Sequence, residues 1–577
     1  MEKSALKRLI DVAAGREEAD VVIKNCKVAD VYNTRVIEGR DVAICAGYIA
    51  GVGEYSGKEI VDARGGYLLP GLIDAHIHIE SSYVTPEEIG RLLIPRGTTT
   101  IIADPHEIVN VCGLDGMRYM LEAARCSKLS ILYMLPSCVP ATPFENAGAV
   151  IDAGMMREPL KDERILGLGE FMNYPGVVHA DDGVLDKLLE ARRAGKLIDG
   201  HSPSLAGNAL NAYAAAGIST DHECTTPEEL VDRVSRGMYV MLRQGSACHN
   251  LRDLVRGVTP TNSGRCLLCS DDCQPKTLLS VGHLDNHLRI LVEEGIDPLT
   301  AVRMASLNAA QCFRLHDRGG IAPGLRADLV LVDNLSDFGV KRVWVKGEEL
   351  AKDGQYLKEV TRSPIDLVRG RFHVRDFTRD KLRLRLKSEQ VRVIDILPGG
   401  VVTGKGRAVV RLDEDGEFVR QPDQDIVKIA VVERHRGTGN VACALLRGYG
   451  IKTGAVALSI AHDSHNIIVV GTDDADMAFA VERLIAQGGG ICLADKQEVV
   501  SAMPMVVGGI MSDQGGEWVS EQLKLIHSAA HDRLGISGGV EPVMTLCFMS
   551  LAVIPELKLT DMGLFDVTTF SFVPVEV

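Results

Sequence analysis

Apolar runs alternate with amphipathic segments along the middle of this chain. Eight runs have the length and near-continuous hydrophobicity of buried strands, at residues 67–80, 98–104, 130–136, 164–170, 197–201, 218–222, 239–243 and 266–271. The segments between them show helical periodicity, for example at residues 87–93, 114–124, 183–194 and 227–235. Buried strands that alternate with helices predict a parallel sheet covered on its outside. We therefore expect an α/β protein with a (β/α)₈ TIM-like barrel over residues 67–321.

Two stretches of alternating apolar and polar residues flank the predicted barrel. Short strands are expected at residues 20–28, 41–45 and 48–52 on one side, and at 327–333 and 343–347 on the other. Asn, Gly and Asp separate these strands, as turns require. The flanks are either two separate β-modules or one β-sandwich that closes when the chain returns. We expect the sandwich, built from residues 1–66 and 322–365.

The remaining third of the chain predicts a domain of its own. Within residues 375–577, strands at 428–433 and 466–471 alternate with a helix at 474–487, which indicates an α/β or α+β fold. Glycine-rich stretches at 488–490 and 508–509 have neither the dinucleotide-binding nor the P-loop spacing, so no nucleotide cofactor is expected there.

Length and charge narrow the function. The chain has 577 residues, which is too long for one hydrophobic core. Its formal net charge of −15 argues against a nucleic-acid surface, because phosphate neutralisation needs clustered Lys and Arg. An acidic field also repels polyanionic substrates, which favours a neutral or cationic small molecule.

Cysteine usage and hydropathy bear on the compartment. The 14 cysteines are scattered without a disulfide framework, as in a reducing cytosol. Cys266 and Cys269 lie in a strand-like run, where residues three apart face opposite sides, so packing is favoured over a zinc site with Cys273. Residues 1–15 are charged and amphipathic, without an apolar core followed by a cleavage site, so no signal peptide is expected. No apolar run approaches the ~18 residues of a membrane span. We expect a cytoplasmic protein without a membrane partner.

Histidines and carboxylates gather where the predicted barrel strands end. His76 and His78 are two apart on one strand, so they project from the same face and form half of a divalent-metal site. The other polar residues at strand ends are Asp104, His106, Glu170, His201, His222 and Asp271. The C-terminal ends of barrel strands converge on one pocket mouth. Together these side chains supply enough ligands for two divalent metals.

Longer stretches carry a more specific signal. They are GLIDAHIHIESS (71–82), ADPHEIVN (103–110), GEFMNYPG (169–176), GHSP (200–203), SDD (270–272), GHLD (282–285), VERH (432–435), AHDSHN (461–466) and ELKLTDMGLFD (556–566). With the order His-x-His, acidic residue, His, His, Asp, they resemble the amidohydrolase superfamily of metal-dependent barrel hydrolases, and within it the adenine deaminases. The resemblance extends over nearly the whole chain.

The resemblance implies a two-metal hydrolase. His76, His78 and Asp271 would hold one ion, and His201 and His222 the other. Glu170 would bridge them, where many relatives carry a carboxylated lysine. Nitrogen and oxygen ligands suit manganese, iron or zinc. The family leans to manganese or iron, so we expect two Mn²⁺ ions, with Fe²⁺ or Zn²⁺ as alternatives. Asp271 would also move the proton of the attacking water, which makes Asp271 and Glu170 the expected catalytic residues.

One departure from related deaminases leaves a role open. Many of them have His-x-x-Glu after strand five, where this chain has His-Ser-Pro-Ser at 201–204, so the acid that protonates purine N1 must come from elsewhere. The candidates for proton transfer or substrate binding are Glu170, Asp104, His106, Glu107, Asp272 and His283. His283, on an expected helix at 281–294, lies either on the surface or in the pocket. His462 and His465 either cap the pocket or shape a turn.

The resemblance implies hydrolytic deamination of adenine to hypoxanthine and ammonia by a homo-oligomer, most simply a dimer. A cyclic amidohydrolase, such as a dihydroorotase or hydantoinase relative, is the second interpretation, disfavoured because Glu170 stands where a lysine would be carboxylated. A catalytically dead scaffold is the third, disfavoured because six buried polar groups are costly unless paired. The small zinc deaminases are excluded because the sequence lacks Pro-Cys-x-x-Cys.

Overall fold

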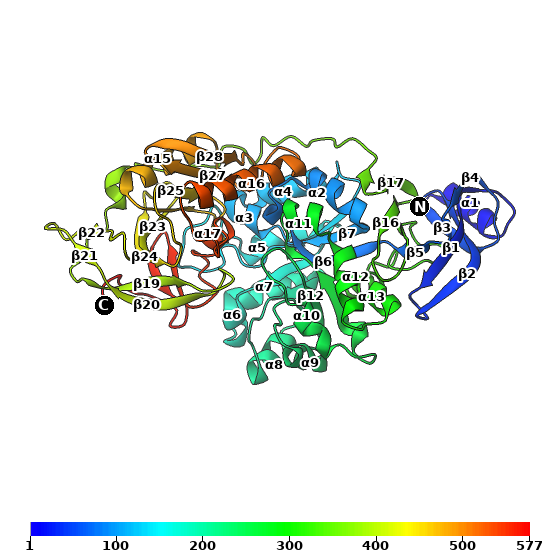
Figure 1. The fold of residues 1–577 in the computed structure, drawn as a ribbon. Helices are drawn as coiled ribbons and strands as arrows, with labels where there is room; N and C mark the ends of the chain where they lie inside the picture. Colours follow the sequence, from blue (N-terminus) through cyan, green and yellow to red (C-terminus); the bar gives the residue numbers. More distant parts are fainter. Residues whose placement is uncertain (1) are drawn as a thin grey trace.

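The computed structural model describes residues 2–577, in three regions arranged in a row (Figure 1). A β-rich N-terminal region lies at one end, the predicted barrel lies in the middle, and the C-terminal region, coloured yellow to red, lies at the other end. Within residues 2–577, no helix is long and apolar enough to cross a membrane.

Parallel strands form the central ring. One sheet has the order β10-β9-β8-β7-β6-β14, and a second has the order β11-β12-β13. Their bounds are β6 Leu72–His78, β7 Thr98–Ala103, β8 Ser130–Leu135, β9 Ile165–Phe171, β10 Leu197–Gly200, β11 Thr220–Asp221, β12 Tyr239–Arg243, β13 Cys266–Cys269 and β14 Asp271–Asp272. A backbone hydrogen bond from Ser219 N to Ile198 O (3.1 Å) joins the two sheets, and β14 pairs with β6 at the other seam. This arrangement confirms the predicted α/β TIM-like class.

Helices cover the outside of the ring where periodicity predicted them. They include α2 Pro86–Leu93, α4 Leu114–Ala124, α7 Asp182–Arg193, α9 Pro227–Ser235 and α12 Leu284–Glu293. Helix α9 begins with a capping box, in which Thr226 and Glu229 satisfy each other's backbone N–H groups, and it buries Leu230. Every residue of β6 and β7 is buried, because helices lie on one side of these strands and the barrel core on the other.

The run at 67–80 is two strands rather than one. Strand β5 (Tyr67–Pro70) pairs with β1 (Ala19–Asp30) and β15 (Leu329–Val332) in the N-terminal region, and only β6 belongs to the barrel. Gly71 joins them and packs so closely on Thr99 that a Cβ atom would collide with its side chain. The single-strand prediction was wrong because both halves are apolar and their pairing partners are distant in sequence.

Both flanks of the barrel share one sheet. Its nine strands run β18-β17-β16-β15-β5-β1-β2-β3, with β4 (Gly57–Asp62) paired to β1. The remaining bounds are β2 Arg35–Cys45, β3 Tyr48–Gly53, β16 Val340–Val345, β17 Glu348–Lys352 and β18 Gln355–Tyr356. The chain therefore returns to the N-terminal unit as expected. Hydrogen bonds join its strands into one continuous sheet, and residues from both flanks, such as Ile44 and Trp344, share one hydrophobic cluster.

The C-terminal region combines an eight-stranded sheet with separate helices. The strand order is β20-β19-β24-β23-β26-β25-β27-β28, and every neighbouring pair is antiparallel except β19 with β24. The bounds are β19 Gln390–Ile396, β20 Thr403–Val409, β23 Ile426–Val432, β24 Val441–Arg447, β25 Ala455–Leu458, β26 Ile467–Gly471, β27 Gly490–Asp495 and β28 Glu498–Pro504. With α15 (Asp474–Ala486) and α16 (Gly516–Asp532), this region is α+β.

The C-terminal region packs tightly against the barrel. One hydrophobic cluster continues from barrel residues such as Ile108 into the C-terminal region at Ile510. Helix α16 lies beside α2, where Gly516 N donates to Glu88 Oε1 at 2.8 Å (Figure 1). This shared core fixes the C-terminal region over one end of the barrel.

The cysteines follow the packing prediction. Cys266 and Cys269 lie in two different hydrophobic clusters, on opposite faces of β13, so they do not form a joint metal site. All fourteen cysteines, each of them within the described residues, are free thiols.

Candidate metal centre and active site

The Nε2 atoms of the two histidines of β6 face each other. His78 Nδ1 donates to the backbone carbonyl of Asp104 at 2.9 Å, and His76 Nδ1 donates to Asp199 Oδ2 at 3.3 Å. In the neutral form of each ring both Nε2 atoms are then unprotonated acceptors, and they face each other at 3.1 Å. Two facing lone pairs repel unless a positive charge lies between them. This geometry fits a metal cation.

Two carboxylates complete the cluster. Asp271 Oδ1 lies 3.0 Å from His78 Nε2 and 3.4 Å from His76 Nε2. Glu170 Oε1 lies 3.3 Å from His78 Nε2, while its Oε2 lies 2.8 Å from His201 Nδ1. The same Oε2 is 3.3 Å from Nε2 of His222. Glu170 thus spans two groups of nitrogen donors, and all six ligands predicted from the sequence converge.

Donor chemistry supports two divalent cations at this cluster. The donors are imidazole nitrogens and carboxylate oxygens without thiolate, a set that suits manganese, iron and zinc. All six side chains are buried, so their converging charges and lone pairs are poorly compensated by solvent. The residues present therefore fit the metals that the sequence predicted.

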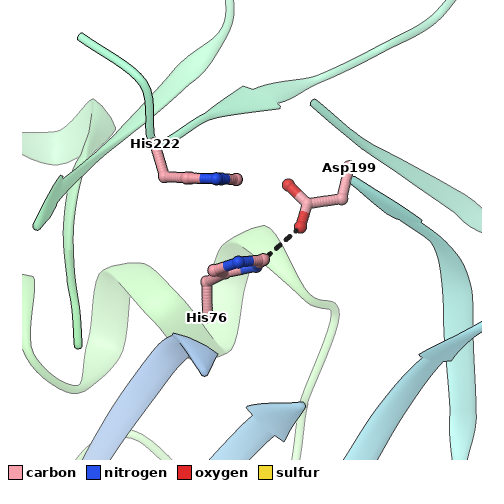
Figure 2. A group of neighbouring side chains, drawn as sticks. All are labelled: His76, Asp199 and His222. Atoms are coloured by element: carbon pink, nitrogen blue, oxygen red, sulfur yellow. Dashed lines mark hydrogen bonds and ion pairs between the residues drawn. The ribbon is translucent and has the colours of Figure 1, made fainter. Parts of the chain in front are cut away.

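Asp199 is a further member of this centre. Figure 2 shows the rings of His76 and His222 lying parallel, with centroids 4.1 Å apart, while the Asp199 carboxylate points at His76. By accepting from Nδ1, Asp199 fixes the tautomer that leaves Nε2 free for a metal. Sequence reasoning missed it, although it stands two residues before His201 and shares that strand's inward face.

We expect Asp199→Asn to weaken metal affinity about 10- to 100-fold, because it removes the carboxylate that orients and polarises His76. Titration of metal-free protein with manganese measures this, with activity as a second readout. Activity should return at high manganese concentration, because the six donors remain. Wild-type affinity in the variant would mean that Asp199 only packs against the ring.

Arg243 and Glu223 contact the predicted ligands from outside the donor cluster, and the sequence analysis did not identify them. Arg243, the last residue of β12, donates from Nη1 to Asp271 Oδ2 at 3.0 Å and also bonds Glu223. Glu223 Oε1 lies 3.3 Å from His222 Nε2. Burial opposes ionisation of Asp271, but Arg243 and the neighbouring histidines outweigh it and hold the pKa of Asp271 well below its usual range. Arg243 stands at a strand end like the predicted ligands, but an arginine does not bind metal cations, so the ligand pattern did not include it.

The other predicted site residues divide into two groups. His106 and Glu107 line the central cavity, and His106 Nδ1 lies 3.2 Å from Glu170 Oε1. Asp104 is not among the lining residues, because its Oδ2 accepts from the backbone N–H of Glu170 at 2.8 Å. His283 is also outside the lining, bonded to Thr98 Oγ1 at 2.8 Å and 2.8 Å from Asp74.

A cavity of about 530 Å³ opens above the donors. Its floor and walls include all of the predicted ligands except His76, together with His106, Glu107, Asp272, Glu223 and Arg243. Its roof comes from the C-terminal region, from residues Pro398, Gly399, Val401, Val402, His462, Asp463, Phe548, Leu551, Val553, Ile554 and Pro555. His462 therefore reaches the cavity, which answers the question that the sequence left open for it.

The roof is fastened from inside by a buried lysine. Lys558 Nζ donates to the carbonyl oxygens of Val401 (2.8 Å) and Phe548 (2.9 Å), and so ties together two segments that line the cavity. Burial lowers the pKa of Lys558 to about 7. The ring of His462 stacks on Phe548 at 4.9 Å between centroids and donates from Nδ1 to Glu107 Oε1 at 2.5 Å. These contacts fix the roof to the barrel.

Known proteins match this chain along its whole length. Residues 67–350 match the model of the amidohydrolase family, and residues 400–571 match that of the adenine deaminase C-terminal domain. The chain is 65% identical over 576 residues to adenine deaminase 2 of Desulfotalea psychrophila and 52% identical over 577 residues to adenine deaminase of Ligilactobacillus salivarius, with 100% of each chain covered. A solved β-aspartyl dipeptidase of Fervidobacterium islandicum AW-1 is 21% identical, with 60% of this chain and 99% of its own covered and a TM-score of 0.47.

Proposed function

This chain belongs to the adenine deaminase family, and we propose that the centre built around Glu170 carries out the family's reaction here. The protein is a metal-dependent hydrolase that deaminates adenine to hypoxanthine and ammonia. The observation that carries the assignment of the centre is the convergence of six buried donors beneath a cavity of about 530 Å³. Neither a cyclic amidohydrolase nor an inactive scaffold receives support from the full-length relatives.

We propose that His76, His78 and Asp271 hold one divalent cation, that His201 and His222 hold the other, and that Glu170 bridges them. Its two oxygens reach toward different nitrogen groups, which supports the bridging role. Cations bound there would supply Lewis-acid activation of water. The donor types suit manganese, iron and zinc, and we propose manganese because the family resemblance favours it.

The protein's own groups move the protons. We propose that the Asp271 carboxylate takes a proton from the attacking water and delivers it to the departing ammonia. Arg243 supports this role, because it keeps the carboxylate ionised and oriented at neutral pH. Of the candidates for protonating the purine ring, His106 and Glu107 have the access that Asp104 lacks.

The C-terminal region encloses the substrate. We propose that the stacked rings of His462 and Phe548, with the aliphatic side chains beside them, cover the purine and exclude water from the donors. Residues 1–66 with 322–365, residues 67–321 and residues 375–577 are accordingly proposed as the three structural units. The third of these is proposed to form part of the active site.

Metal analysis tests the pair of cations. We expect about two ions per chain in reconstituted protein, and a loss of bound metal in Glu170→Gln, because the variant removes the charge shared by both sites. Glu190→Gln is the control, since Glu190 is also buried but pairs with Arg157 away from the centre. Saturation by one ion, with Glu170→Gln binding metal normally, would disprove the bridge.

A substrate panel tests the function. Ammonia release should be fast with adenine and slow or absent with adenosine, cytosine and guanine when manganese is present. Hydrolysis of dihydroorotate without ammonia release from adenine would overturn the assignment in favour of a cyclic amidohydrolase.

A further inference from the structure

A small side chamber adjoins the main cavity. Its volume is about 20 Å³. The polar residues around it are Glu80, Ser81, Tyr83, Glu107, Asp272, Gln274, His462 and His465, and the apolar ones are Ile460, Ile510 and Met544. Three of these residues, Glu107, Asp272 and His462, also line the main cavity, so the two spaces share a wall.

One carboxylate oxygen at this chamber lacks a partner. Glu80 is 3% exposed, and its Oε1 accepts from the backbone N–H of Ile108 at 3.2 Å. Its Oε2 is buried without a hydrogen-bond donor among residues 2–577. A buried, unpaired carboxylate oxygen is costly, so the position calls for a donor that the protein does not provide.

The surrounding charges favour a cationic donor. Glu107 is bonded to both His462 and His465, whereas Asp272 has only the neutral hydroxyl of Ser81. The phenol oxygen of Tyr83, which accepts from Gln274 Nε2 at 3.3 Å, adds a neutral acceptor. Within the described chain, the chamber's lining contains no lysine or arginine. His462 and His465 are both bonded to Glu107, so Oε2 of Glu80 is left without a cationic partner among residues 2–577.

Size and wall chemistry identify the class of cation. A volume of about 20 Å³ suits a single water-sized occupant, which needs roughly 10–15 Å³. Mg²⁺ and Ca²⁺ require six or more oxygen ligands, and the wall of Ile460, Ile510 and Met544 offers none on its side. Ammonium is the size of water, carries one positive charge and has four N–H donors. It matches the available carboxylate and phenol oxygens.

We propose that the side chamber binds one ammonium ion, the protonated product, as it leaves the main cavity. This inference rests on the deaminase activity described above, which produces ammonia in the main cavity. Glu80 is the principal acceptor and Tyr83 the auxiliary one. The main cavity then retains hypoxanthine alone, and the two products leave separately.

Diffraction can test the site without turnover. Crystals of the holoenzyme soaked in thallium(I) acetate, an ammonium-sized anomalous scatterer, should show a peak in the chamber. The peak should be lost in Glu80→Gln and weakened in Tyr83→Phe. Glu87→Gln is the matched control, because Glu87 is also 3% exposed, has one oxygen bonded to a backbone N–H and the other unpartnered, but does not line the chamber. It should keep the peak.

Product inhibition tests the same site in solution. Ammonium acetate, compared with sodium acetate at equal ionic strength, should inhibit adenine deamination, with an inhibition constant raised about tenfold or more in Glu80→Gln and unchanged in Glu87→Gln. An empty chamber in thallium-soaked wild-type crystals, or a divalent ion in it, would overturn the proposal, as would equal ammonium inhibition in both variants. Failure of wild-type enzyme to deaminate adenine would instead refute the proposed function, whatever the thallium result.

Discussion

Replacing Asp271 with asparagine is expected to lower kcat for adenine by about 10²–10⁴-fold, the contribution of a positioned general base. The side chain keeps its shape, but an amide cannot accept a proton from water at neutral pH. Hypoxanthine formation at saturating adenine and manganese measures the effect. Metal content must be determined on the same sample, because Asp271 Oδ1 also lies 3.0 Å from Nε2 of the proposed ligand His78. A loss of turnover that exceeds the loss of metal isolates the proton-transfer role.

Asp272→Asn is the matched comparison for Asp271→Asn. The two residues are adjacent on β14, yet the Asp272 carboxylate is bonded by Ser81, whereas that of Asp271 meets Arg243 and the two histidines of β6. We expect Asp272→Asn to keep at least about ten times the activity of Asp271→Asn, because it does not remove the general base. The opposite ranking would assign the base to Asp272.

AMP is expected to be deaminated with a kcat/KM about a thousandfold or more below that of adenine. The cavity is lined by six carboxylates: Glu107, Glu170, Glu223, Asp271, Asp272 and Asp463. Within residues 2–577, Arg243 is the only Lys or Arg in that lining, and its guanidinium is bonded to Glu223 and Asp271. A phosphate on the ribose, beyond the proposed metals, would meet these carboxylates without a free Lys or Arg to pair with, and such like-charge contacts cost several kcal/mol.

Adenosine should fall between adenine and AMP. Its ribose hydroxyls would lie under the aliphatic roof, where each unpaired polar group costs about 1–3 kcal/mol. Steady-state ammonia release from the three substrates gives the ranking. The ranking should survive exchange of manganese for iron or zinc, because it comes from the cavity lining. Equal turnover of adenosine and adenine would contradict this account of specificity.

Local sequence patterns predicted the barrel well because its strands and helices are defined by local periodicity. Strand β12 and helix α9 begin and end where hydrophobicity and capping place them. The convergence of the six donors was predictable for a related reason, since barrel topology brings strand ends together whatever their separation in sequence. The merged run at 67–80 shows the limit. Its division at Gly71 depends on pairing with β1 and β15, which local hydrophobicity does not encode.

The roof residues, and the residues that contact the proposed ligands, could not be predicted from the sequence for a different reason. Phe548 and Leu551 are ordinary apolar residues with no motif, and they reach the cavity only because the C-terminal sheet packs over the barrel. The bond between Glu107 and His462 joins residues 355 positions apart. Arg243 and Asp199 act through ligands rather than as ligands, so a search for metal-binding residue types passes over them.

The position of the roof residues in the sequence also determines at which stage of translation the protein can become active. A ribosome completes all six proposed donors once Asp271 has been made, yet Phe548 and the Lys558 that fastens it are made only later. A growing polypeptide therefore carries the full set of proposed ligands while the cavity above them is still open to solvent. A chain terminated just before Lys558 keeps all six donor residues. It lacks the lysine that fastens the roof, so its main cavity is not closed. We expect a nonsense mutation at Lys558 to abolish activity as completely as one in the barrel.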